Sequence, residues 1–219
     1  MQSTSFSRRS LIVGVTGISA LQRSYAQSSS VGSRLTSRFD LDRFVEQVRS
    51  ARQESDGQRA VEEVLRRTVS QPKQILSELG EPVEAGIHTL HRDRDLTILN
   101  VVWAPLMVLL PHNHNMWASI GIYTGREDNI LWERRGESVT ATRAASLSER
   151  QVFGLPADAI HSVTNPIGRL TGAIHIYGGD FFAPGRSEWD AETLLERPWD
   201  IEAARKEFAK AAKRFEAVP

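Results

Sequence analysis

The spacing of apolar residues divides the chain into a helical part, a strand-rich part and a second helical part. From Asp40 onward, the stretch "DLDRFVEQVRSARQ" places its apolar residues on one helical face, with Asp40 positioned as the N-cap. The stretches "QRAVEEVLRRTV" and "PKQILSELG" predict two further helices, and Pro72 suits the first turn of the last one. Helical spacing returns near the end of the chain. We therefore expect helices within residues 39–80 and over residues 200–216.

Residues 86–183 differ, because they consist of short β-branched or aromatic runs separated by turn signals. The runs include "LTILNVVW", "WASIGIY" and "LTGAIHIY", and the breaks include Ala104–Pro105 and "TGRED". Many strands at such regular spacing indicate an antiparallel sandwich or barrel. The C-terminal helix carries one apolar stripe and is expected to pack on the outside of this barrel. The pattern predicts a mainly β fold, in one domain over residues 39–219.

Composition and charge narrow the classes of partner. The chain is 40% hydrophobic, with 27 basic and 27 acidic residues, as in an ordinary soluble globular protein. No basic run indicates nucleic acid, and no apolar stretch reaches the roughly 20 residues that span a bilayer. The absence of cysteine excludes disulfides and thiolate metal ligands. We expect no nucleic acid and, in the mature form, no membrane as partner, while monomer and homodimer both stay open.

The first 26 residues have the order of an export signal. Arg8 and Arg9 in "SRRSL" precede an uncharged, weakly apolar run, and the segment ends at Ala26. This order resembles a twin-arginine signal. Residues 27–38 then read as a flexible lead-in. The mature protein is expected in the periplasm or outside the cell, and without a working signal it would be cytoplasmic.

Two histidines lie two positions apart in "PHNHN". In an extended segment the side chains alternate between faces, so His112 and His114 point the same way and can reach one metal ion. A lone pair of this kind also occurs on ordinary surfaces. His161, in "FGLPADAIHSVTN", follows a Gly/Pro turn at the start of a later strand. Antiparallel pairing inside a barrel can bring it opposite the first two, so the three histidines are predicted to bind a metal.

The two histidine segments resemble the paired motifs of the cupin superfamily. "PHNHNMWASIGIYTG" is similar to the first motif and "GLPADAIHSVTN" to the second, and the match covers residues 96–182. A general cupin has a glutamate ligand shortly after the second histidine, whereas this chain has Ala118 and Ser119. Three histidines without an acid resemble the thiol dioxygenases of the cysteine dioxygenase type, which also carry an H-x-Y pair. In this chain "AIHIYGG" supplies that pair as His175 and Tyr177.

This resemblance implies both a fold and a chemistry. The fold would be the cupin double-stranded β-helix, or jelly-roll barrel, with N-terminal helices and a C-terminal helix. One Fe(II) ion per chain would be held by the three histidines, and a small thiol would react with O₂ to give a sulfinate. Tyr177, with its hydroxyl supported by His175, would donate a hydrogen bond during the reaction.

Two features depart from the thiol dioxygenases. Ser119 stands near the position of a cysteine that some members crosslink to the tyrosine, so that crosslink is excluded here. Those enzymes also bind the substrate carboxylate with an arginine upstream of the first motif. The stretch "HTLHRDRDL" offers Arg92 and Arg94, and neither falls clearly at that position. The identity of the substrate is therefore left open.

Other interpretations stay open at this point. The protein could be a non-catalytic cupin that binds a metal or small ligand, or an enzyme with another divalent metal and a non-thiol substrate. His175 and Tyr177 could be a buried pair that only makes the core rigid. His88 and His91 lie in a charged, loop-like stretch and are expected to be solvated.

Overall fold

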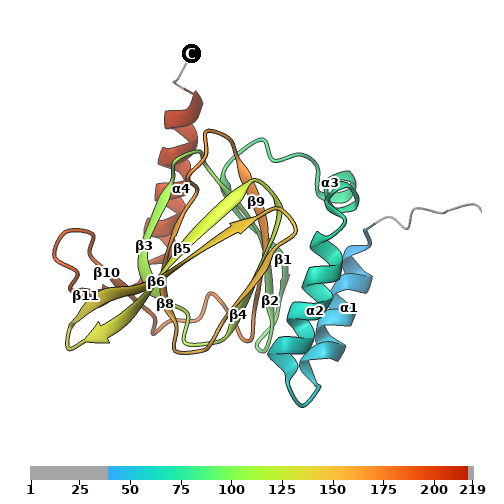
Figure 1. The fold of residues 1–219 in the computed structure, drawn as a ribbon, viewed down its shortest axis with the longest axis horizontal. Coiled ribbons are helices and arrows are strands. Elements are labelled where there is room, and N and C mark those ends of the chain that lie inside the picture. Colours follow the sequence, from blue (N-terminus) through green and yellow to red (C-terminus); the bar gives the residue numbers. More distant parts are fainter. Residues whose placement is uncertain (1–38, 217–219) are drawn as a thin grey trace, which may run out of the picture. The chain divides into compact units, whose positions relative to one another are not determined.

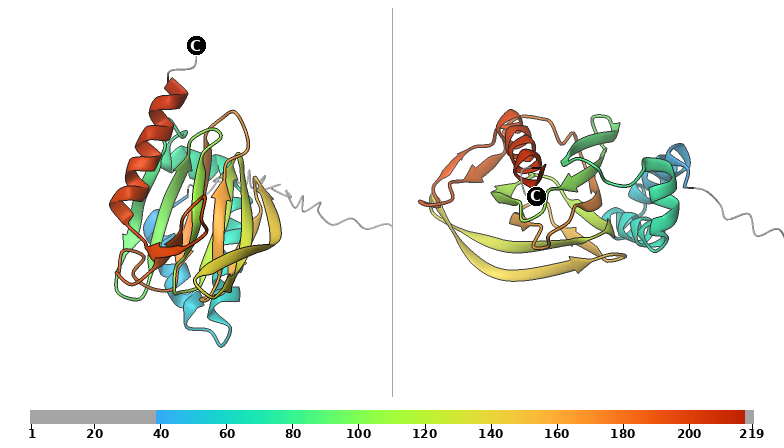
Figure 2. Two further views of the ribbon diagram at one scale, coloured as in Figure 1. Left: turned by 90° about the vertical axis from the view of Figure 1, so that its left-hand side faces the viewer. Right: turned by 90° about the horizontal axis from the view of Figure 1, so that it is seen from above.

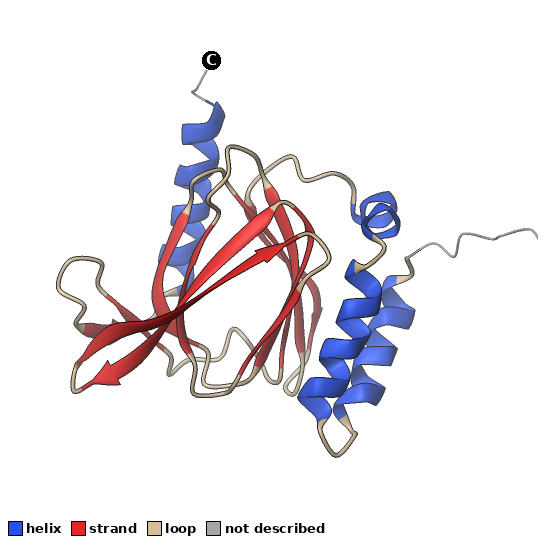
Figure 3. Ribbon diagram, viewed as in Figure 1, coloured by secondary structure: helices blue, strands red, loops and turns tan. Residues whose placement is uncertain are grey.

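The computed structural model describes residues 39–216, which form two antiparallel sheets with helices before and after them (Figure 1). The export signal and lead-in predicted over residues 1–38 lie outside the described residues. The helices α1 (Leu41–Arg52), α2 (Gly57–Val69) and α3 (Pro72–Leu79) precede the sheets, and α4 (Ile201–Glu216) follows them (Figure 3).

The two sheets contain five and six strands. In spatial order, the five-stranded sheet consists of β1 (Gly86–Arg92), β2 (Thr97–Trp103), β9 (Thr171–Tyr177), β4 (Ala118–Thr124) and β7 (Val152–Leu155). The six-stranded sheet consists of β11 (Glu196–Pro198), β10 (Ser187–Trp189), β3 (Val108–Asn113), β8 (Ile160–Thr164), β5 (Arg126–Arg135) and β6 (Ser138–Ser148). Figure 2 shows the two sheets as separate layers.

The connections between strands identify the fold. From β2 to β9, every connection crosses from one sheet to the other, except in the β5–β6 hairpin. The four-stranded cores β2-β9-β4-β7 and β3-β8-β5-β6 are therefore interleaved along the chain. This is the strand order of the eight-stranded jelly roll found in cupins. The predicted fold class, a mainly β cupin-type barrel flanked by helices, is confirmed.

The N-terminal helices cover the outer face of the five-stranded sheet (Figure 1). Asp40 accepts a hydrogen bond from the backbone N–H of Arg43 and so caps α1, as the sequence predicts. Gly121 allows α2 to pack closely against β4, because a Cβ atom at this position would lie only 2.7 Å from Leu65 Cγ. In the described part of the chain, no helix is long and apolar enough to cross a membrane.

The last helix, α4, takes part in the barrel interior. Phe208 is 2% exposed and belongs to the apolar cluster between the sheets. Its ring centroid lies 5.0 Å from that of Trp103 on β2. The sequence predicts packing on the outside of the barrel, and the structure adds that Phe208 of this helix reaches the interior cluster. The apolar stripe predicts that one face of the helix is buried, but helical spacing does not say which surface that face meets.

Candidate metal centre

Three histidine side chains converge inside the barrel. His112 lies near the end of β3 and His114 directly after it, and the register of β3 with β8 places His112 opposite His161. All three are buried, and one ring nitrogen from each lies within 4.8 Å of the others. The structure thus brings together the three histidines that the sequence selects, and this group could hold a metal ion.

Hydrogen bonds fix which nitrogen of two of these rings is free. His112 Nδ1 donates to the carbonyl oxygen of Leu110 at 2.8 Å, and His161 Nδ1 donates to Asn129 Oδ1 at 2.7 Å. Each ring therefore keeps its Nε2 lone pair. His114 Nε2 lies 3.4 Å from His161 Nε2, so these two nitrogens face one another. A ligand histidine usually has its second nitrogen tied to an oxygen in this way.

The charge state of the cluster also suits a metal. Burial lowers the pKa of His112 to about 4. Burial, and then the neighbouring histidines, lower the pKa of His114 and of His161 well below the usual range. Near pH 7 the three imidazoles are therefore neutral, the form that binds a cation. The donor set fits a divalent metal.

No carboxylate joins this group of ligand atoms among the described residues. Ala118, near the position of a general cupin's glutamate, lies in the interior apolar cluster. Ser119 has the same strand parity as Gly121, whose neighbours belong to α2, so it faces the helices. Tyr177 lies in the interior cluster instead. Ser119 and Tyr177 therefore lie on opposite faces of the sheet.

A buried polar network links the tyrosine to the histidine cluster. The Tyr177 hydroxyl lies 3.1 Å from His175 Nδ1, and His175 Nε2 lies 3.2 Å from Glu127 Oε2. Asn129 Nδ2 donates to Glu127 Oε1 at 3.0 Å, and Asn129 Oδ1 accepts from His161. A carboxylate oxygen accepts, so His175 Nε2–H donates to Glu127 Oε2, and the Tyr177 hydroxyl then donates to His175 Nδ1. The network then has one consistent set of donors and acceptors.

Tyr177 lies directly beside the histidines. Its ring centroid is 5.0 Å from that of His114, in an edge-to-face arrangement. Burial raises the pKa of its hydroxyl, so the hydroxyl stays protonated at neutral pH. The structure therefore places a proton donor next to the cluster, together with the His175 partner expected from the sequence.

Similar proteins share the fold at low sequence identity. No family model matches the sequence, and no curated protein matches it. A cupin-family protein from Methanocaldococcus jannaschii is 12% identical, with a TM-score of 0.37 over 43% of this chain and 80% of that one. A cupin superfamily protein from Desulfitobacterium hafniense is 16% identical, with a TM-score of 0.38 over 48% and 88%. These neighbours are cupins. Similarities this low carry no argument by themselves, so the fold class rests on the strand order.

The arginines suggested by the sequence lie at the surface. Arg92 forms a bidentate pair with Asp180, at 2.8 and 2.9 Å, and its side chain is 48% exposed. Arg94 has a side chain that is 91% exposed, beside Asp95. Neither lines the cavity at the histidines. The structure therefore gives no support to Arg92 or Arg94 as the group that binds the substrate.

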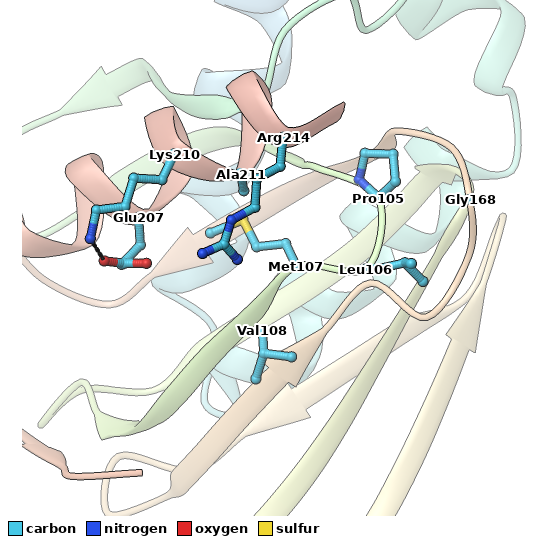
Figure 4. Close-up of a pocket in the computed structure, with 9 residues that line it drawn as sticks. All are labelled: Pro105, Leu106, Met107, Val108, Gly168, Glu207, Lys210, Ala211 and Arg214. Atoms are coloured by element: carbon cyan, nitrogen blue, oxygen red, sulfur yellow. Dashed lines mark hydrogen bonds and ion pairs between the residues drawn. The ribbon is translucent and has the colours of Figure 1, made fainter. Parts of the chain in front are cut away.

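The cavity beside the histidines is small. Its volume is about 20 Å³, close to the space for one water molecule. Apolar side chains from α4 and from the segment before it, including Phe208 and Trp199, form part of its wall. A larger cavity of about 510 Å³ lies elsewhere, between the β2–β3 loop and α4, with Met107 and Lys210 in its lining (Figure 4). No histidine lines this larger cavity, so size does not identify the chemical site.

Sequence reasoning missed Glu127 and Asn129. Both are fully buried on β5, which starts at Arg126, so most of "TGRED" is strand and only Gly125 separates it from β4. The signal that could have found them is alternation, because Glu127, Asn129 and Leu131 share one face of the strand. His88 and His91 likewise lie in a strand, β1, where His88 is exposed and His91 is half-buried against Asp93.

Replacing Glu127 by glutamine is expected to weaken both folding and metal binding. The amide keeps the volume but turns one acceptor into a donor, so the N–H of Trp103, Asn129 or His175 loses its partner. A buried donor left unpaired costs about 1–3 kcal/mol. Mutation of a residue in the hydrogen-bond network that orients a metal ligand typically lowers the affinity for the metal about 10–100-fold. Chemical unfolding of metal-free protein and anaerobic titration with Fe(II) measure the two effects.

The matched control is Glu133→Gln on the same strand. Glu133 pairs with Arg135 at the surface, and its side chain is 57% exposed. This variant should keep wild-type stability and metal affinity. If Glu127→Gln has the same stability and metal affinity as the control, the hydrogen-bond network does not hold His161 in place for metal binding.

Proposed function

We propose that this protein is an Fe(II)-dependent dioxygenase that converts a small thiol to a sulfinate. The observation that carries the proposal is the group of three buried, neutral histidines without a carboxylate, next to Tyr177 and His175. Three neutral ligands leave the full +2 charge on the ion, which favours an anionic ligand such as a thiolate. His112, His114 and His161 would hold the ion.

The proposed reaction balances without a further co-reactant. When bound, Fe(II) supplies the redox chemistry that joins O₂ to a coordinated thiolate. Both atoms of O₂ form bonds to sulfur, the S–H bond breaks, and the proton leaves. Sulfur loses four electrons, and O₂ takes up all four. No other reductant is needed.

The protein's own residues would orient the reactants and exclude water. The apolar residues in the wall of the small cavity would limit the access of water to the site. Glu127 holds His175, which in turn positions the Tyr177 hydroxyl. Rotation about the C–O bond of Tyr177 redirects its proton from His175 Nδ1 toward the substrate. Tyr177 would then donate a hydrogen bond where negative charge develops.

Metal analysis combined with O₂ uptake tests the proposal. Protein purified without oxygen is analysed for metals and then mixed with O₂ and a panel of small thiols. We expect iron, and uptake of one O₂ for each thiol consumed. Stoichiometric zinc without uptake would support a non-catalytic metal-binding protein, an alternative favoured by the cavity of only about 20 Å³. Uptake with a substrate that has no thiol would support a different cupin enzyme.

We also propose export of the folded protein through the twin-arginine route. The sequence of residues 1–26 supports this, and loading the metal before export would let the cell choose iron where copper or zinc would otherwise bind more tightly. A reporter fused after Ala26 should be exported only while Arg8 and Arg9 are both present. Export that survives replacement of both by lysine would contradict the proposal, because a receptor reads the arginine pair.

A further inference from the structure

The cavity between the β2–β3 loop and α4 is a separate candidate site (Figure 4). Its volume of about 510 Å³ lies within the range of about 300–1,000 Å³ that is usual for small-molecule pockets. It shares no lining residue with the cavity beside the histidines. A ligand bound there would therefore be distinct from the substrate of the metal centre.

Apolar side chains form much of the lining of this cavity. Met107 is 4% exposed and belongs to the apolar cluster between the sheets, and Ala211 of α4 packs against that cluster. Leu106 and Val108 line the same cavity, yet they are 69% and 58% exposed. Large apolar side chains that are exposed together at a cavity are typical of a surface that binds an apolar group.

Leu106 holds its exposed side chain in an unfavourable backbone conformation. The N–H of Met107 donates to the carbonyl oxygen of Ala104 at 3.2 Å, which closes a turn with Pro105 and Leu106 at its centre. The φ angle of Leu106 is +58°, in the left-handed region. A positive φ at the third residue of a turn normally selects glycine or asparagine. A leucine at this position gives the fold neither a favourable turn nor a buried side chain, which suggests that its side chain serves a ligand.

The helix side of the cavity carries a positive charge. Figure 4 shows Glu207, Lys210 and Arg214 on α4, across from the loop that carries Leu106. Lys210 Nζ lies 2.6 Å from Glu207 Oε1, so these two charges offset each other. Arg214 forms no ion pair with another residue in the described part of the chain. One uncompensated cation beside an apolar lining complements a ligand that has one negative charge and an apolar body.

We propose that this cavity binds a small amphiphilic monoanion, a carboxylate with a linear alkyl chain. The chain would lie against Leu106, Met107 and Val108, and the guanidinium of Arg214 would hold the carboxylate. The proposal is independent of the dioxygenase function, because no histidine lines this cavity.

Three matched probes test the proposal by isothermal titration calorimetry. Octanoate has both features, butyrate has the carboxylate with a shorter chain, and 1-octanol has the chain without the charge. We expect octanoate to bind at least about tenfold more tightly than butyrate, because each buried methylene contributes about fourfold. Octanoate should also bind at least about threefold more tightly than 1-octanol, which is the effect of an exposed ion pair.

Two variants with matched controls locate the binding site. Arg214→Gln should lose the preference for octanoate over 1-octanol. Lys213→Gln should keep it, because this variant removes the same charge from the same turn of α4 and Lys213 does not line the cavity. Leu106→Asn should bind both octanoate and 1-octanol at least about threefold more weakly. Leu195→Asn should bind them as wild type does, because Leu195 is 50% exposed and lies outside the cavity.

The ligand-free melting temperature separates binding from a structural role. Asparagine tolerates a positive φ, so Leu106→Asn should melt at the wild-type temperature or higher. A lower melting temperature with unchanged octanoate binding would overturn the inference, because Leu106 would then serve the fold. If Leu106→Asn folds poorly, Arg214→Gln and Lys213→Gln still decide the question, since both of these side chains are exposed.

Three other results would also contradict the proposal. They are an absence of octanoate binding by wild type, octanoate binding that neither Arg214→Gln nor Leu106→Asn alters, and self-association of wild type that Leu106→Asn abolishes without any octanoate binding. The last result, measured by analytical ultracentrifugation, would make Leu106 part of an interface between two copies of the chain.

Discussion

Replacing His161 by alanine is expected to remove most of the bound metal while the barrel stays folded. The variant loses one of the three converging nitrogens, and two imidazoles hold a divalent ion poorly. We expect the affinity for the metal to fall at least about 100-fold. This exceeds the 10–100-fold loss that is typical when only a residue that hydrogen-bonds to a ligand is changed. The fold should persist, because the interior is held by a continuous apolar cluster that includes Leu99, Ile120 and Val163.

Metal content per chain and the far-ultraviolet circular dichroism spectrum measure the two parts of this prediction. His88→Ala is the matched control, because His88 is exposed on β1 and takes no part in the cluster. It should keep its metal. Full occupancy in His161→Ala would show that His161 is not a ligand, and the assignment of the second histidine motif would fail.

Replacing Tyr177 by phenylalanine is expected to keep the metal and to slow turnover about 10²–10³-fold, the usual effect of losing a donor that acts on developing charge. The aromatic ring, which packs against Phe181 and beside His114, remains. Only the hydroxyl is lost, so folding and the three ligands should change little. The measurement is kcat at equal iron content on the thiol that proves most active.

Tyr123→Phe is the matched control for this variant. Tyr123 is equally buried, but it lies in the cluster beneath the helices and its hydroxyl donates to Asn100 at 2.9 Å. Its kcat should stay near that of wild type. If kcat is also unchanged in Tyr177→Phe, the pair of His175 and Tyr177 serves only to make the core rigid.

The sequence predicts those parts of this molecule that depend on local periodicity. Alternation along strands places His112 and His114 on one side, and helical spacing with a capping aspartate locates α1. The strand pairing that brings His161 opposite His112 follows only from the resemblance to a known barrel, because single-sequence periodicity does not give the register between distant strands.

Other parts depend on burial of charged groups, which local patterns misread. Glu127 is charged and stands in a stretch that resembles a turn, so its sequence predicts exposure. In the folded barrel it is fully buried. Arg186 has the sequence setting of an ordinary surface arginine, whereas in the fold it is 5% exposed and its Cζ atom lies 3.4 Å from the ring centroid of Trp199. In both cases the side chains that bury the charged residue come from other parts of the chain. A charged residue is normally predicted to be exposed, so the sequence alone does not reveal that these two are buried.

The proposed function requires the three-histidine centre to add both atoms of O₂ to the sulfur of a small thiol. Mass spectrometry of the product formed by iron-loaded protein under ¹⁸O₂ tests this most directly. The account predicts a sulfinate in which both oxygen atoms are labelled, made by wild type and absent with His161→Ala. A disulfide as the only product, or a sulfinate with unlabelled oxygen, would contradict it.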